Sequence, residues 1–237
     1  MKLIRKLFTS FILAILIYSG FMLLQIFGKY QYGQDVYSGI QQKVFSKEIN
    51  TEVPLNTNPN PIASTMRDIN SDYIAWINIK GTSINYPIVS ESSDIDYLTH
   101  DFYKNKNFYG CLFVSQINPF KCGNTIIYGH NMKNGAMFGS LKKYLDQSYF
   151  NNHRNISIYY NNYVINYYVF SVQITNANSS AYEYDVSSNY FKNIKDASII
   201  SPIDFQPNET TDIITLSTCY QTSSRLLIQA YKRKDNL

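Results

Sequence analysis

The segment Thr215–Tyr231, TLSTCYQTSSRLLIQAY, contains two β-type runs separated by a short polar stretch. Alternation of apolar and polar residues is typical of β-strands, so the first run predicts a strand ending at Cys219 and the second a strand beginning at Arg225. If these strands are neighbours in one sheet, the Cys219 thiol and the Arg225 guanidinium project from the same rim. The chain has only three cysteines, so a cysteine at a strand end is a candidate for chemistry.

Six further β-type runs precede these two, with turn residues between them, and eight such runs predict a β-sandwich or a β-barrel. The runs are YIAWINIKG (73–81), SINYPIV (83–89), YGCLFVS (109–115), NTIIYGH (124–130), ISIYY (156–160), YVINYYVFSVQI (163–174), DIITLSTC (212–219) and RLLIQAY (225–231). Residues 65–70, 136–150 and 188–196 have a helical pattern instead.

The N-terminal segment predicts a membrane-spanning helix. Residues 7–27 carry no charge and are long enough to cross a bilayer core. Lys2, Arg5 and Lys6 precede this run and only Lys29 follows it closely, which predicts a cytoplasmic N-terminus. A cleaved signal peptide is the alternative, but the apolar run is longer than a usual signal core and no A-x-A cleavage site follows it.

These features divide the chain into four parts and predict a single-pass protein of the cell membrane. The parts are a cytoplasmic N-terminus (1–6), a transmembrane signal-anchor helix (7–27), a juxtamembrane helix with a linker (28–63) and an extracellular domain (64–237).

Charge and motifs argue against several classes of ligand. The net charge is +4, but the part after residue 28 holds 18 basic and 17 acidic side chains. Nucleic-acid binding normally needs a concentrated basic surface, and this nearly neutral part of the chain does not indicate one. The chain has no glycine-rich nucleotide-binding motif. His100 and His153 have no partners at metal-ligand spacing, so the sequence predicts neither a metal nor another cofactor.

Three cysteines leave at least one thiol unpaired within an exported chain. Cys111 and Cys122 could form a disulfide across a hairpin-like segment, or both could be free, semi-buried thiols. The sequence leaves both alternatives open.

Three residue types point to acyl transfer through a thioester. The thiolate of Cys219 is a nucleophile, and a neighbouring cation favours it over the thiol. Arg225 is always charged and its planar donors suit an oxyanion. His130, in a Gly- and Asn-rich turn after a β-type run, could transfer protons. Taken singly, each residue could also be structural.

At these residues the sequence resembles the class B sortases, cysteine transpeptidases of Gram-positive cell envelopes. The resemblance rests on four ordered blocks: YIAWINIKGTSINYPIV (73–89), YLTHDFYKNKNFYGCLFVS (97–115), IYGHNMKNGAMFGSL (127–141) and TLSTC (215–219). It implies an eight-stranded sortase-type β-barrel with N-terminal helices and one or two helices in the connections.

The resemblance also implies roles for single residues. Cys219 is expected to be the nucleophile, His130 the general acid and base, and Arg225 the oxyanion and substrate clamp. The gap after the cysteine is shorter here than in other members, so Arg233 is the alternative arginine. Residues that flank these positions, Tyr128, Ser217 and Thr218, are expected to line the substrate groove or to serve in packing.

The implied partners are secreted proteins with a C-terminal sorting motif of the N-P-x-T-[NG] type, cleaved after threonine, and a peptidoglycan cross-bridge or stem amine as acceptor. Three alternatives remain from the sequence: a pilin-polymerising sortase, a thiol hydrolase that uses water in place of the amine, and a non-catalytic β-barrel that binds wall peptides.

Overall fold

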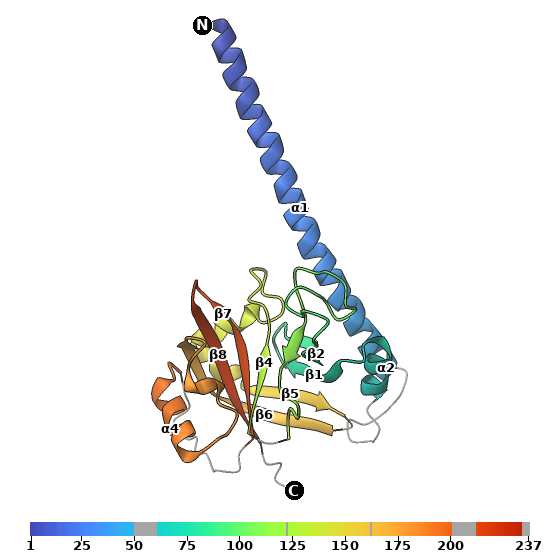
Figure 1. Cartoon of the computed structure of the whole chain (residues 1–237), viewed down its shortest axis with the longest axis vertical. Helices are drawn as coiled ribbons and strands as arrows, with labels where there is room; N and C mark the ends of the chain where they lie inside the picture. Colours follow the sequence, from blue (N-terminus) through green and yellow to red (C-terminus); the bar gives the residue numbers. More distant parts are fainter. Residues whose placement is uncertain (50–60, 122, 162, 201–211, 234–237) are drawn as a thin grey trace.

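Eight strands close into a β-barrel in a computed structural model of the chain, in the order β1-β2-β3-β4-β7-β8-β6-β5 (Figure 1). The structure describes residues 1–49, 61–121, 123–161, 163–200 and 212–233. The strands are β1 (Tyr73–Ile79), β2 (Asn85–Ser90), β3 (Leu112–Val114), β4 (Asn124–Tyr128), β5 (Asn155–Tyr160), β6 (Tyr163–Thr175), β7 (Ile213–Tyr220) and β8 (Ser224–Lys232). The prediction of an eight-stranded barrel is confirmed, and each strand falls on one of the eight β-type runs.

One parallel pairing brings distant parts of the chain together. β4 pairs with β7 in parallel, although the connection between them contains two strands and several short helices. Parallel neighbours require such a crossover because the end of the first strand and the start of the second lie at opposite edges of the sheet. The pairing places the C-terminal ends of β4 and β7 at the same edge of the barrel.

The faces of β7 and β8 follow from their alternation. Ile214 and Leu216 of β7 belong to the main core inside the barrel. Ile213 and Leu227, one position along, belong to a second apolar cluster outside it, against α4 (Ser188–Ala197). α4 therefore covers part of the outer face of these strands.

Short helices fill the connections: α2 (Pro61–Ile69), the 3-10 helices η1 (Gly139–Leu145) and η2 (Ser180–Tyr182), α3 (Gln147–Asn152) and α4. The single helical stretch expected over 136–150 is two elements. Asp146 separates them, because its extended backbone ends η1 while its side chain accepts a hydrogen bond of 2.8 Å from Tyr149 N at the start of α3.

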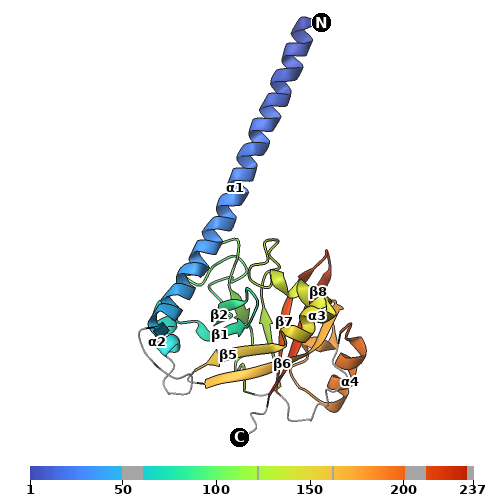
Figure 2. The ribbon, with the colours of Figure 1, turned by 180° about the vertical axis from the view of Figure 1, so that it is seen from behind.

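The N-terminal helix α1 (Lys2–Ile49) is continuous and projects from the barrel as a long rod (Figures 1 and 2). Its first half is exposed, and it is long and apolar enough to cross a membrane. Its second half packs on the barrel through Tyr37, Ile40 and Val44, which are buried. Gly33 permits this close approach, because a Cβ there would lie 2.4 Å from the Tyr109 ring.

Two expectations lie outside the described residues. Most of the predicted linker falls on residues 50–60. Cys122, one partner of the alternative Cys111–Cys122 disulfide, also lies outside the described residues, and Cys111 is a free thiol.

Candidate active site

The strand pair β7–β8 brings Cys219 and Arg225 together. The two residues are direct cross-strand partners in this antiparallel pair, and direct partners project on the same side of a sheet. Both side chains lie on the outer face of the barrel. Cys219 is an even number of residues from the outward-facing Ile213 on β7, and Arg225 is an even number from the outward-facing Leu227 on β8. Cys219 is exposed, so its thiol is accessible to a ligand.

The alternative arginine lies elsewhere. Arg233 follows the end of β8 at Lys232, eight residues beyond Arg225. At the rise of an extended strand, this separation is about 25 Å. Of the two arginines, only Arg225 lies beside Cys219.

The pairing of β4 with β7 brings His130 to the same edge. Tyr128 is the register partner of Ser217, and Gly129 N donates to Ser217 O at 3.1 Å. His130 follows Tyr128 by two residues, and Cys219 follows Ser217 by two residues. The adjacent Asn131 fastens the turn to the nucleophile strand, since its Nδ2 donates to Cys219 O at 2.7 Å.

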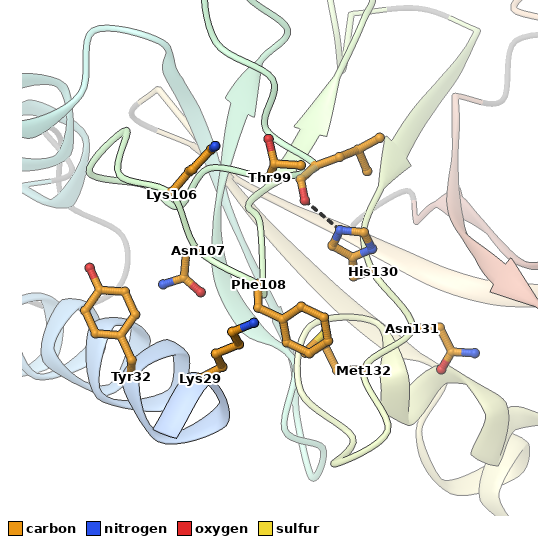
Figure 3. Close-up of a pocket in the computed structure, with 10 residues that line it drawn as sticks. Lys29, Tyr32, Thr99, Lys106, Asn107, Phe108, His130, Asn131 and Met132 are labelled. Atoms are coloured by element: carbon orange, nitrogen blue, oxygen red, sulfur yellow. Dashed lines mark hydrogen bonds between the residues drawn. The ribbon is translucent and has the colours of Figure 1, made fainter. Parts of the chain in front are cut away.

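The ring of His130 is held by a backbone carbonyl. Its Nε2 lies 2.6 Å from Leu98 O (Figure 3). A carbonyl oxygen only accepts hydrogen bonds, so Nε2 carries a proton, which leaves Nδ1 of a neutral ring as the acceptor. Leu98 was missed from the sequence because a carbonyl contact leaves no mark on the residue type, although the segment YLTH belongs to one of the four blocks.

Two of the three flanking residues face the same side as Cys219. Ser217 is two residues before it on β7, and Tyr128 is the partner of Ser217 on β4. Thr218 has the opposite orientation: it is buried and its Oγ1 donates to Gly129 O at 2.7 Å. The structure therefore places Tyr128 and Ser217 with the candidate site, and gives Thr218 a contact that holds the His130 turn to β7.

Tyr182 of η2 joins this surface and was not expected from the sequence. Its hydroxyl lies 2.8 Å from Ser217 Oγ, and its ring stacks on Tyr128 with 6.4 Å between centroids. Burial raises the pKa of Tyr182, while the charge of Arg225 acts in the opposite direction. Tyr182 is thus a neutral hydroxyl at physiological pH, within electrostatic range of Arg225.

Cys111 has the opposite environment to Cys219. It is free and fully buried, and burial raises the pKa of its thiol to about 12. A buried thiol with a high pKa is a poor nucleophile. Of the two cysteines within the described ranges, Cys219 is the one suited to react.

The titratable groups of the described residues form no cluster of three or more that could hold a metal ion. The arrangement of an accessible thiol, an imidazole and a guanidinium at one edge suits nucleophilic acyl transfer.

Comparisons with known proteins agree with this geometry. A family model described as the sortase domain matches residues 77–233. Sortase B of Listeria monocytogenes is 32% identical over 211 residues, which cover 82% of this chain and 84% of that protein. Sortase B of Staphylococcus aureus is 28% identical over 232 residues and 92% of each chain.

A solved structure described as the Staphylococcus aureus sortase B-substrate complex has the same architecture. It superposes with a TM-score of 0.77 at 27% identity, covering 87% of this chain and 98% of that chain. The likeness extends over nearly all of the solved chain.

Proposed function

The chain belongs to the sortase family of cysteine transpeptidases, and from this premise we propose that it is a membrane-anchored class B-type sortase with Cys219 as its nucleophile. It cleaves a C-terminal sorting motif after threonine and transfers the protein to a cell-wall amine. His130 is the general acid and base, and Arg225 binds the oxyanion.

One observation carries the proposal. The β4–β7 and β7–β8 registers bring the ends of three strands together, so that His130, Cys219 and Arg225 occupy adjacent positions at one edge of the barrel. β7 and β8 form a hairpin, whereas β4 is distant from both in the sequence and is brought beside β7 by the closure of the barrel. Their adjacency therefore supports a shared chemical role for the three side chains.

The first half of the reaction forms a thioester. The Cys219 sulfur attacks the carbonyl carbon after the motif's threonine, and Arg225 donates hydrogen bonds to the resulting oxyanion. The C–N bond then breaks, and His130 delivers the proton that came from the thiol to the leaving amine.

The second half reverses these roles. His130 takes a proton from the incoming wall amine, whose nitrogen attacks the thioester carbonyl. The C–S bond breaks, a new amide bond forms, and Cys219 regains its proton. Atoms and charge balance without a cofactor.

Tyr128, Ser217 and Tyr182 are proposed to line the groove that receives the sorting peptide. They lie on the outer face beside Cys219 and are joined by a hydrogen bond and a ring stack. The structural relative from Staphylococcus aureus is described as a substrate complex, which supports a peptide site in this fold. A motif of the N-P-x-T-[NG] type is the proposed substrate.

The apolar half of α1 supports placement in the cell membrane. With residues 1–6 in the cytoplasm and 7–27 in the bilayer, residues 28–63 connect to a catalytic domain, 64–237, on the outer side. Exported proteins and lipid-linked wall precursors are held at the same surface, so tethering raises their effective concentration at the enzyme.

The test is mass spectrometry of the full-length chain in detergent micelles, incubated with N-P-Q-T-N, S-P-K-T-G and L-P-E-T-G peptides, with and without an amine acceptor. We expect a peptide thioester on Cys219 and an amine-joined product. Cys219→Ala should abolish both, while Cys111→Ala, which removes a buried thiol, should retain them.

The products separate the remaining alternatives. Water-terminated peptide in the presence of amine would identify a thiol hydrolase. A preference for a lysine of a second protein substrate would identify a pilin-polymerising enzyme. Peptide binding without any thioester, from a folded chain, would contradict the catalytic assignment and favour a wall-peptide-binding barrel.

A further inference from the structure

A cavity of about 600 Å³ lies between α1 and the barrel, beside His130 (Figure 3). Three separate segments form it: α1, the loop before β3 and the turn after β4. Its walls include Lys29 and Tyr32 on α1, Lys106 and Phe108 on the loop, and His130 and Met132 on the turn.

The cavity combines positive charge with apolar surface. Lys29 and Lys106 both line it, no acidic side chain does, and neither lysine forms a salt bridge with any residue in the described ranges. The rings of Tyr32 and Phe108 and the side chain of Met132 make much of the remaining wall. An anionic group with an apolar body attached fits this combination.

The position of the cavity along α1 identifies where such a ligand would come from. Lys29 is two residues beyond Phe27, the last residue of the uncharged run, which is about 3 Å along a helix. The headgroup region of a bilayer extends roughly 5–8 Å beyond each side of the hydrocarbon core. If α1 spans the membrane, the cavity opens at the depth of the lipid headgroups.

We propose that this cavity binds the headgroup of an anionic phospholipid, with its phosphate between Lys29 and Lys106, its polar head against Tyr32 and Phe108, and its acyl chains running back along α1 toward the bilayer. The proposal rests on the membrane placement given under the proposed function. The loop that carries Lys106 also carries Leu98, whose carbonyl accepts the hydrogen bond from His130. A bound lipid therefore contacts both the anchor and the loop that orients the proposed base.

The test uses the full-length chain in phosphatidylcholine nanodiscs that contain a photoactivatable phosphatidylglycerol. Mass spectrometry then maps the adducts to peptides. We expect adducts on the peptides that contain Tyr32, Phe108 and Met132, and about fivefold fewer in Lys29→Gln and in Lys106→Gln, since each lysine near an anionic surface strengthens binding by roughly that factor.

Matched variants control for charge and folding. Lys6→Gln removes a lysine from the other end of the apolar run, and Lys142→Gln removes an exposed lysine outside the cavity; both should leave the cavity adducts unchanged. Lys106→Arg keeps a phosphate-binding cation and should retain the adducts.

Three results would overturn the proposal: equal labelling by a phosphatidylcholine probe, stronger labelling by a photoactivatable polyprenyl diphosphate, or adducts at the cavity that do not depend on either lysine. The readout needs no turnover. Lysine-dependent labelling of a chain that forms no thioester would reject the proposed transpeptidase and leave the lipid site standing, whereas a thioester with lysine-independent labelling would do the reverse.

Discussion

Arg225 lies directly across from Cys219, and the chemistry proposed for it depends on its planar donors as well as its charge. Arg225→Lys keeps the charge but loses the guanidinium. We expect kcat for a sorting peptide to fall by about 100-fold, the size of effect seen when an oxyanion donor is removed. Steady-state kinetics with a fluorogenic peptide measure this change.

Arg233→Lys is the matched control for that variant, because it makes the same chemical change at the far end of β8. It should leave kcat within about twofold. A large loss in Arg233→Lys with a small one in Arg225→Lys would reverse the assignment.

The hydroxyl of Tyr182 is hydrogen-bonded to Ser217 on the proposed groove. Tyr182→Phe removes the hydroxyl that bonds Ser217 Oγ and leaves that buried oxygen without this partner. We expect KM for the sorting peptide to rise about three- to tenfold, the range for one neutral hydrogen bond, with kcat little changed. Tyr184→Phe, an exposed tyrosine two residues away, is the control. An unchanged KM in Tyr182→Phe would remove Tyr182 from the groove.

The helix α1 lies in two different environments along its length, exposed in its first half and packed on the barrel in its second half. Ile40 is fully buried against the barrel, whereas Ile17 is 65% exposed in the apolar half. Ile40→Ala should lower the free energy of unfolding by about 2–4 kcal/mol, as for other large-to-small core substitutions. Thermal unfolding in micelles measures the shift.

Ile17→Ala makes the same change on the exposed half and should leave the melting temperature of the barrel nearly unchanged. A melting temperature that is nearly unchanged in Ile40→Ala as well would mean that the second half of α1 is not part of the folded core.

The strands could be predicted from the sequence more completely than the helices. All eight β-type runs correspond to strands, because runs of β-branched and aromatic residues bounded by turn residues are a local pattern. The stretch 136–150 was predicted as one helix and is two, because Asp146 both ends η1 and caps α3. That choice depends on a side-chain contact that periodicity does not contain.

At the scale of the whole molecule, buried tyrosines couple stability to alkaline pH. Burial raises the pKa of Tyr73, Tyr144, Tyr167 and Tyr190 above the usual value. Below about pH 10 these groups are neutral in both states. Above it, the unfolded chain loses their protons first, so the folded state loses up to about 1.4 kcal/mol per pH unit for each tyrosine.

The melting temperature should therefore be nearly constant from pH 8 to 9.5 and fall steeply above about pH 10. Tyr73→Phe should reduce the slope, and it should be tolerated because the Tyr73 hydroxyl is buried with no hydrogen-bond partner among the described residues. Tyr163→Phe, at an exposed position, should leave the slope unchanged. A melting temperature that stays flat up to pH 11.5 would contradict this coupling.

The sequence by itself determined the strands, the apolar segment and the residue types of the candidate site, since alternation, charge-free length and a family's motifs are all written along the chain. Only the tertiary structure decided that Arg225 rather than Arg233 lies beside Cys219, that Leu98 O holds His130, and that Tyr182 joins Ser217. The contacts of Leu98 and Tyr182 join residues more than 30 positions apart in the sequence. Their geometry is set by strand register and by the closure of the barrel, which no local pattern specifies.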